Sequence, residues 1–184
     1  MIRTANINDA PKVAILLIKA MKELAVQYVN DPDPYKAIPL FKLFAAKDNN
    51  QYSYQNMLVY CLDDKVVAVI NGYDGKRFLD LRRPFISYLR NEQKIGIANE
   101  AETAEGEYYI DALSVDEEYQ GKGIGRKLIL KLIEKARNEG FEKVGLLVST
   151  EKDAAKRLYE SLGFEIVGLK HLLGEHYHHM QLIA

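Results

Sequence analysis

The chain has 184 residues, of which 48% are apolar, and this length favours a single domain spanning residues 1–184 with one sizeable core. The formal net charge is −1, from 25 basic and 26 acidic residues, so no overall positive field exists to hold nucleic acid or an anionic membrane. The single cysteine, Cys61, excludes an internal disulfide and a Cys-rich zinc site, and the start of the chain has no signal-peptide layout, so we expect a cytoplasmic protein with a buried thiol.

The first third of the chain predicts a strand, two helices and a hairpin. Asn8 or Asp9 is expected to cap the first helix, and the Pro-rich run 31–34 is expected to end it. Two β-rich runs are joined by Asp63 and Asp64, which predicts a tight hairpin. The predicted elements are a strand at 2–5, a helix with periodic apolar residues from 13 to 28, a helix at 35–46, and strands at 57–62 and 65–71.

Residues 74–107 form the least regular part, an insert for which we expect one helix, Phe78–Asn91, and then a polar loop. The loop from Ala98 to Glu107 is acidic and carries no basic residue, so it could attract a cationic amine or be simply a solvated loop. A basic stretch over 76–90 could pair with it, contact a phosphate, or do neither.

The second half alternates strands with helices, which predicts an α/β fold with a mixed sheet covered by helices on both sides. Gly140 and Gly163 each follow a helical pattern and are expected to end it in the left-handed conformation. Thr150 is expected to cap the second of these helices. The predicted elements are a strand at 108–115, a helix at 123–138, a strand at 143–148, a helix up to 162, and strands starting at 164 and covering 177–182.

A glycine-rich loop, Gln120-Gly121-Lys122-Gly123-Ile124-Gly125, separates a predicted strand from a strongly periodic helix. Uncovered backbone N–H groups at a helix N-terminus favour an anion, and a phosphate or pyrophosphate is the natural ligand. The loop matches neither a Walker loop, because Gly121-Lys122 is not followed by Ser or Thr, nor a Rossmann loop, because residues 116–120 separate it from the strand. A tight turn without a ligand is the alternative.

From Ile110 to Phe164 the chain resembles the GNAT superfamily of N-acetyltransferases. Gln120, Gly123 and Gly125 match that family's Gln/Arg-x-x-Gly-x-Gly/Ala motif. The helix segment Ala155-Lys156-Arg157-Leu158-Tyr159, followed by Gly163-Phe164, matches its Ala-x-x-Leu-Tyr and Gly-Phe pattern. The resemblance implies a mostly antiparallel central sheet splayed at its central strand, and transfer of an acyl group from acetyl-CoA to an amine.

The resemblance also implies which residues hold the coenzyme. The strand backbone at 113–115 would pair with the pantetheine arm, and the amides of 121–126 would hold the pyrophosphate. Many family members have Asn three residues before the helix Ala, whereas this chain has Lys152, which could contact the arm or a phosphate or only face water. The expected coenzyme-binding residues are Leu113, Ser114, Val115, Gln120, Gly121, Lys122, Gly123, Ile124, Gly125, Arg126, Lys152, Ala155 and Tyr159.

The resemblance makes Tyr159 the candidate general acid for the departing thiolate, whose pKa of about 8.5 lies below the tyrosine value of about 10. Read without the motif, Tyr159 is a core residue on the apolar stripe of its helix. The acceptor ammonium must lose a proton, and Asp111 and Glu107 are the candidate bases; a chain of water molecules, a structural role for Asp111 and a solvated strand end for Glu107 are the alternatives.

Four histidines, at 171, 176, 178 and 179, lack a third ligand at recognised spacing, so no metal is expected. The predicted partner is a small-molecule or peptide amine, with no nucleic acid or membrane, and an exposed terminal strand could support a homodimer. The sequence leaves open the acceptor, a longer acyl donor, and a CoA-binding module without turnover.

Overall fold

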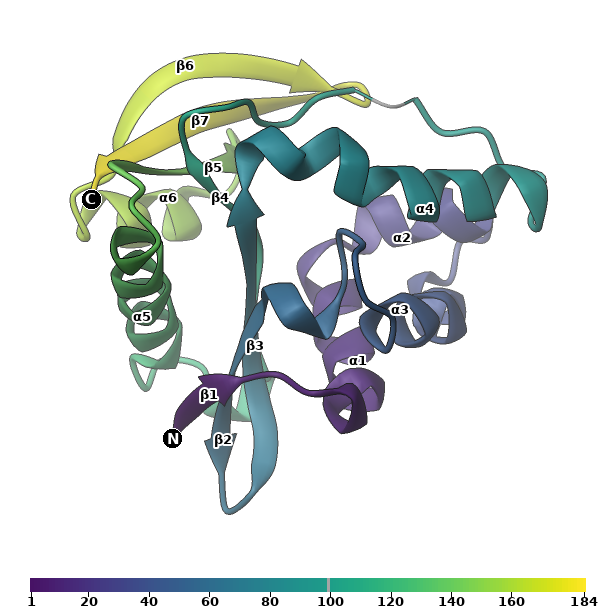
Figure 1. Cartoon of the computed structure of the whole chain (residues 1–184), viewed down its shortest axis with the longest axis horizontal. Coiled ribbons are helices and arrows are strands. Elements are labelled where there is room, and N and C mark those ends of the chain that lie inside the picture. Colours follow the sequence, from purple (N-terminus) through teal and green to yellow (C-terminus); the bar gives the residue numbers. More distant parts are fainter. Residues whose placement is uncertain (99) are drawn as a thin grey trace.

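A computed structural model describes residues 1–98 and 100–184, so position 99 of the acidic loop lies outside the described residues. The described chain forms one seven-stranded sheet in the order β1-β2-β3-β4-β5-β7-β6 (Figure 1). The strands are β1 (Ile2–Thr4), β2 (Met57–Leu62), β3 (Lys65–Asp74), β4 (Tyr108–Val115), β5 (Lys143–Ser149), β6 (Glu165–Leu172) and β7 (Glu175–Ile183).

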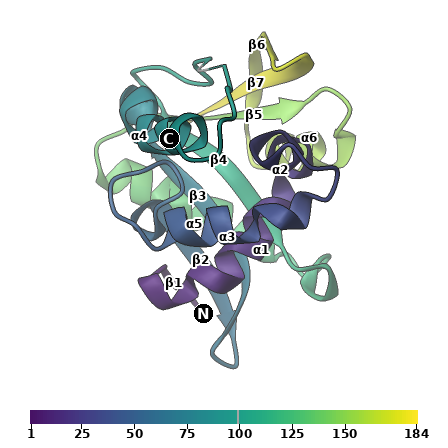
Figure 2. The same ribbon diagram turned by 90° about the vertical axis from the view of Figure 1, so that its right-hand side faces the viewer.

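Helices cover both faces of the sheet, as the alternating pattern predicts (Figures 1 and 2). Among the described residues, four of them lie on the side of one face and two on the side of the other, so the sheet separates the two larger hydrophobic clusters. The first face carries α1 (Ala10–Ala20), α2 (Lys22–Val29), α3 (Ile38–Ala45) and α4 (Phe78–Asn91), and the second carries α5 (Ile124–Asn138) and α6 (Asp153–Glu160).

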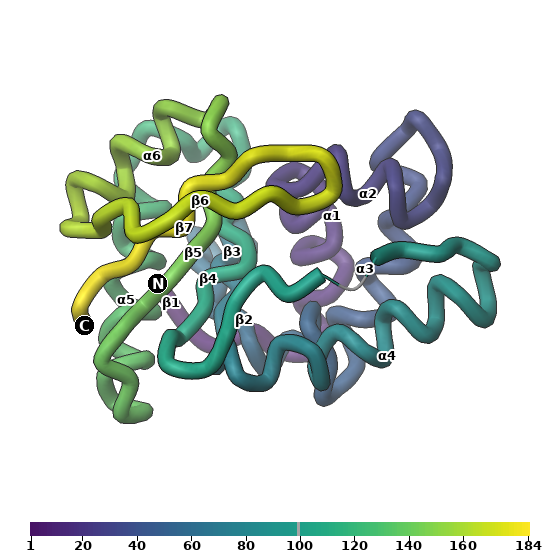
Figure 3. The backbone as a smooth tube through the Cα atoms, turned by 90° about the horizontal axis from the view of Figure 1, so that it is seen from above, coloured from purple at the N-terminus to yellow at the C-terminus, as the bar shows by residue number. Residues whose placement is uncertain are grey.

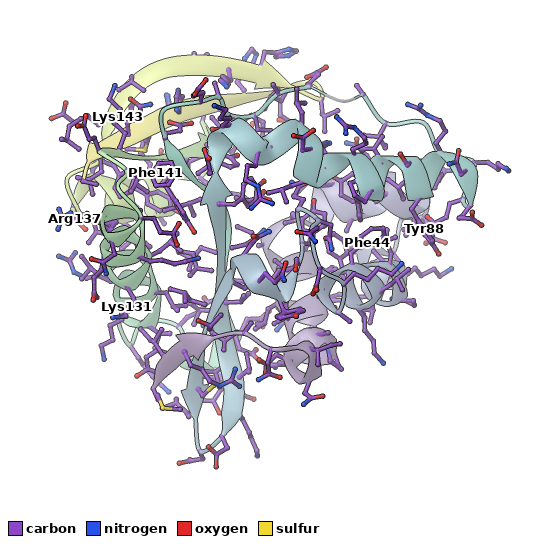
Figure 4. The ribbon with its side chains drawn as sticks, viewed as in Figure 1. Phe44, Tyr88, Lys131, Arg137, Phe141 and Lys143 are labelled. Atoms are coloured by element: carbon purple, nitrogen blue, oxygen red, sulfur yellow. The ribbon has the colours of Figure 1, made fainter. Side chains whose placement is uncertain are left out.

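Aromatic rings fill the cluster beneath α2, α3 and α4. Phe85 makes edge-to-face contacts with Tyr28, Phe44 and Tyr52, with ring centroids 4.9–5.0 Å apart. At its rim Phe44 and Tyr88 meet between α3 and α4 (Figure 4). These contacts hold α4, the helix of the insert, against the rest of the fold.

The strand pairs are antiparallel except for β4 and β5, which run parallel. Their register pairs join only Tyr108–Ile110 to Val144–Leu146, although β4 continues to Val115 and β5 to Ser149. Within the described residues the two strands therefore separate after three pairs. This opening is the splayed central strand that the family resemblance implies.

Helix caps differ from the sequence-based expectations at two places. Asp9, one of the two predicted candidates, occupies the N-cap position of α1 but makes no side-chain capping bond there. The side-chain cap comes from Asn6 one turn earlier: it accepts from the Asn8 amide, and Asp9 completes the capping box of that turn as its third residue. Asp9 also accepts two hydrogen bonds from Arg3, which holds the entering strand beside the turn. The predicted first helix is in addition broken at Met21, whose backbone leaves the helical region.

Thr150 does not cap α6, contrary to the prediction, because its hydroxyl is directed to the main-chain oxygen of His176 on β7. Lys152 occupies the cap position and makes no side-chain capping bond. The hairpin turn is confirmed: Asp63 and Asp64 have φ values of 46° and 62°, as a type I′ turn requires.

The β6–β7 hairpin extends from the edge of the sheet toward the side of α1 and α2 (Figure 3). Strand β6 is an outer strand, and Ile166, Val167 and Leu169 on it are exposed.

Candidate active site

The glycine loop lies directly before α5 and has an open, left-handed backbone. Gly121 and Gly123 have φ values of 72° and 71°, a region that side-chain-bearing residues rarely adopt. A Cβ at either position would meet no atom within 4 Å, so space lies over the loop. Gly123 is the N-cap of α5 and supplies no side-chain cap. The first amides of α5 therefore face this space without a side-chain partner at the cap.

The loop is fixed at its start by polar contacts to β4 and α1. The Gln120 side-chain amide donates to the main-chain oxygen of Val115 at 3.0 Å. Asp116 accepts from Lys12 and Lys19 of α1, and these bonds lower the pKa of the Asp116 carboxyl to about 2. The Gln120 side chain thus ties the loop to the end of β4.

The basic side chains of the loop have local partners. Lys122 donates to the main-chain oxygen of Glu118, and Arg126 donates to the hydroxyl of Ser161 after α6. Both side chains are exposed, so either can turn toward an anion over the loop. Ile124, by contrast, is buried in the core beneath α5.

The free side of β4 lies next to this loop. A Cβ on Gly125 would lie 3.7 Å from the side chains of Leu113 and Val115, so α5 begins close to the end of the strand. Ser114, between them, is buried on the other face of the sheet. Because β5 no longer pairs here, the strand backbone can accept an extended ligand.

Tyr159 of α6 is buried between the sheet and the end of its helix, with 9% of its surface exposed. Its ring meets Phe164 edge-on at 5.7 Å, and burial raises the pKa of its hydroxyl to about 12. At neutral pH this hydroxyl is protonated and can donate. Ala155 is half-buried one turn earlier, whereas Lys152 is exposed at the cap.

Asp111 follows the last residue of β4 that pairs with β5, and a register shift between β3 and β4 leaves it without a partner residue in β3. Asn71 pairs with Ala112 and the next residue, Gly72, pairs with Ile110, so Asp111 is an extra, unpaired residue in β4. A β-bulge of this kind turns a side chain out of the regular alternation. It places the Asp111 carboxyl at the point where the sheet opens.

The hydrogen bonds of Asp111 occupy one carboxylate oxygen. Oδ2 accepts from the Gln51 amide at 2.9 Å, the Tyr73 hydroxyl at 2.9 Å and the Asn71 amide at 3.3 Å. Among the described residues no donor bonds Oδ1. Burial raises the pKa of Asp111 despite these donors, so its affinity for a proton exceeds that of an ordinary carboxyl.

Glu107, the other candidate base, is held in a closed set of hydrogen bonds. It accepts from Thr103 at 2.6 Å and Gln181 at 2.7 Å, and lies 2.9 Å from His179 Nε2. Burial opposes its ionisation, but these bonds outweigh burial and lower the pKa of the carboxyl. Its side chain is 4% exposed and lies over Gly145 of β5, so it bridges the start of β4 to β5 and β7.

Two residues of the insert join the Asp111 side of the opening. Arg82 of α4 is 2% exposed, and its Nη1 lies 3.3 Å from Oε1 of Glu102. The Tyr109 hydroxyl donates to Glu102 at 2.9 Å. Lys76 likewise pairs with Glu105, so the basic stretch pairs with the acidic loop, one of the two roles expected for it.

The residues around Asp111 come from well-separated segments, so their meeting could not be predicted from the sequence. One signal was available: Arg82 stands among the buried apolar positions of α4, where an isolated cation needs a buried partner. These surrounding residues are Gln51, Asn71, Tyr73, Arg82, Glu102 and Tyr109.

Within residues 1–98 and 100–184 no group of three or more His, Cys, Asp or Glu side chains is arranged to hold a metal ion. His171 and His176 lie with ring centroids 4.7 Å apart, and His179 contacts Glu107. Over the same residues, none of the helices combines the length and apolar character needed to cross a membrane.

Comparison with known proteins identifies the class. The sequence pattern of the acetyltransferase (GNAT) family matches residues 18–164. A solved structure described as an acetyltransferase is 29% identical, with a TM-score of 0.83 over 100% of this chain and 98% of its own. An N-acetyltransferase from Staphylococcus aureus Mu50 is 24% identical and shares the fold, with a TM-score of 0.83 over 99% of this chain and 100% of its own.

Among curated proteins, N-alpha-acetyltransferase RimI of Mycobacterium tuberculosis is 45% identical over 75 residues, which is 41% of this chain and 46% of that protein. The match thus spans about half the length of this relative. Because the family pattern covers most of the chain, the chain belongs to the GNAT acetyltransferase family.

Proposed function

We propose that the protein is an N-acetyltransferase that moves an acetyl group from acetyl-CoA to a primary amine by direct attack. The observation that carries this is the opening between β4 and β5, with an unobstructed glycine loop at one end and a carboxyl of raised pKa at the other. The family uses acetyl-CoA as the acyl donor, and the residues present fit that molecule.

The donor side of the site is built from backbone. Amides of the 121–126 loop face open space at a helix N-terminus, which suits a pyrophosphate. The unpaired edge of β4 at 113–115 suits the amide-containing pantetheine arm, which would add to the sheet like a strand. A backbone N–H on that edge would stabilise the thioester oxygen as negative charge develops there. Lys122 and Arg126 are exposed at the loop and would add positive charge, and Lys152 is exposed at the N-cap of α6.

The acceptor side is built from side chains. An aliphatic amine arrives as an ammonium, with a pKa of about 10.4, and must lose a proton before it can attack. We assign this step to Asp111, whose Oδ1 has no bound donor among the described residues while its Oδ2 is fixed by three. Glu107 is assigned a structural role instead, because its oxygens are engaged by Thr103, His179 and Gln181.

Tyr159 is assigned as the proton donor to the departing thiolate. Its hydroxyl is protonated at neutral pH, since burial raises its pKa to about 12. A thiolate with a pKa of about 8.5 is less basic than this tyrosinate, so the proton transfer is uphill and gains from coupling to bond cleavage.

Thermal unfolding with acetyl-CoA, CoA and NAD is the first test. A ligand at 100 times its dissociation constant adds about 2.7 kcal/mol of stability, a shift of several degrees. A shift with both CoA compounds and none with NAD supports the donor site; no shift with either CoA compound would sink the proposal.

The acceptor is then sought by thiol release from acetyl-CoA with small amines, amino acids and peptides with free N-termini. The name of the RimI relative supports including N-terminal α-amines in that set. Propionyl- and longer acyl-CoA run in parallel test the donor length, and CoA binding without turnover of any amine would indicate a binding module.

A further inference from the structure

Two carboxyl groups and one guanidinium lie together beside the opening of the sheet. Asp111 is bonded by the Tyr73 hydroxyl at 2.9 Å, and Glu102 by the Tyr109 hydroxyl at 2.9 Å. The rings of these two tyrosines are 6.0 Å apart in an edge-to-face contact, and the two carboxyls lie close enough for the charge of Asp111 to act on Glu102. Arg82 lies 3.3 Å from Glu102 and is 2% exposed.

The charges of this group do not balance when both carboxyls are ionised. Arg82 is the buried cation facing them, whereas Lys170 of β6 bonds the main-chain oxygen of Glu102 at 2.7 Å and is half-exposed, so water screens its charge. The other groups near the pair are neutral phenols and amides: Tyr28 of α2, Gln51 and Tyr52 before β2, Asn71 and Tyr73 of β3, Tyr109 of β4 and Tyr177 of β7.

The pKa values of both carboxyls are shifted upward, as expected when two carboxylates face one buried cation. Burial, followed by the charge of Asp111, raises the pKa of Glu102 to about 7. Burial also raises the pKa of Asp111. Two carboxyls that oppose each other's ionisation lose their protons in two separate steps, which belong to the pair.

We propose that Asp111 and Glu102 together retain one proton in the resting protein, with Arg82 balancing the remaining negative charge. This rests on the proposed function, in which Asp111 accepts the proton of the acceptor ammonium. The reactive form has the proton on Glu102 and the charge on Asp111. Glu102 is then a positioning residue: it sets the charge of Asp111 from the insert loop without touching the acceptor.

The test is Glu102→Gln, which mimics the protonated form of Glu102 with the same shape. Its matched control is Glu105→Gln, which removes the same charge from an exposed position of the same loop. The titration of Asp111 is followed by NMR of the ¹³C-labelled carboxyl carbon, assigned as the signal lost in Asp111→Asn. This readout needs no acceptor and no turnover.

In the unaltered protein the Asp111 carbon should report two steps, one above the ordinary value of about 3.9 as Asp111 ionises and one at higher pH as the pair loses its remaining proton, whereas in Glu102→Gln the step at higher pH should be absent. Glu105→Gln should leave both steps in place. A step at higher pH that persists in Glu102→Gln overturns the proposal, as does its loss in both variants, which would show only a long-range effect of net charge.

With an acceptor in hand, Glu102→Gln should keep the acid limb of the kcat/KM profile in place and retain activity at pH 8, while any change in kcat/KM at the pH where the pair loses its remaining proton should be absent. A loss of activity at every pH would show a structural role and overturn the proposal. If no amine is ever acetylated, the proposed function fails, while the NMR titration still decides the proton sharing.

Discussion

The two ends of the opening between β4 and β5 are built in opposite ways. The donor end is a continuous loop, 120–125, whose backbone supplies the binding groups and whose glycines keep it uncovered. The acceptor end gathers side chains from β3, α4, β4 and two loops around one bulged residue, Asp111. A surface made of backbone depends on local conformation, whereas one made of side chains depends on the whole fold. The two ends should therefore respond differently to substitution.

The largest effect is expected at the donor end, from Gly123→Glu. The new side chain would strain a residue with φ of 71° and place a negative charge where the pyrophosphate is expected. Affinity for acetyl-CoA should fall by about 100-fold or more, about 2.7 kcal/mol. Calorimetric titration measures this, with Gly96→Glu as control, since Gly96 is exposed and its φ is not positive. Equal binding by the two variants would contradict the donor assignment.

At the acceptor end, Asp111→Asn should leave acetyl-CoA binding intact and lower kcat/KM by about 10²–10⁴, the usual range for loss of a general base. Asparagine keeps an oxygen for the donors Gln51 and Tyr73, so the fold should survive. Asp80→Asn on the exposed face of α4 is the control. A kcat/KM within twofold of that of the unaltered protein would show that Asp111 is not the base and would favour water as the proton acceptor.

Tyr159→Phe tests a residue that belongs to the coenzyme-binding motif and is also assigned a step in the reaction. We expect kcat to fall about 10-fold or more, with unchanged CoA affinity. Tyr88→Phe, which removes a hydroxyl at the distant α3–α4 contact, should have no effect (Figure 4). Pre-steady-state thiol release separates this step from product release, and an unaltered rate would leave Tyr159 a core residue.

The smallest effect is on stability alone. Glu107→Gln should lower the free energy of unfolding by about 1–3 kcal/mol at pH 7, because its charged hydrogen bonds are lost. The folded-state pKa of Glu107 is depressed, so its contribution is present above the unfolded value of about 4.3 and is lost as pH falls through the folded value. Urea unfolding at pH 7, 5 and 3.5 should show the difference from the unaltered protein closing. Glu134→Gln on exposed α5 is the control, and a difference that persists at pH 3.5 would exclude the ionic origin.

The same contrast explains what could be predicted from the sequence. The helix 78–91 and the strand 108–115 were predicted with their observed bounds, since periodicity and flanking breakers are local. The cap at Asn6 and the break at Met21 were missed, because several polar residues compete to cap and a helical pattern continues through the break. The bulge at Asp111 and its partners depend on strand register, which no spacing in the chain reveals.

The donor loop was found because a motif stands in consecutive residues. The pairing of Glu102 with Arg82, and of Glu107 with His179, joins segments 20 and 72 residues apart. The choice between Asp111 and Glu107 as base was open from sequence, and their unequal hydrogen bonding favours Asp111.

Gly145 restricts which substitutions this chain can accept during evolution. It lies under the Glu107 carboxyl, and a methyl group there would overlap the carboxylate atoms. A larger residue at 145 therefore requires the Glu107 side chain to leave its hydrogen bonds with Thr103, His179 and Gln181, or the acid at 107 to be shortened or lost. In a combined library of both positions, alanine at 145 should be recovered more often with aspartate or a smaller residue at 107 than with glutamate.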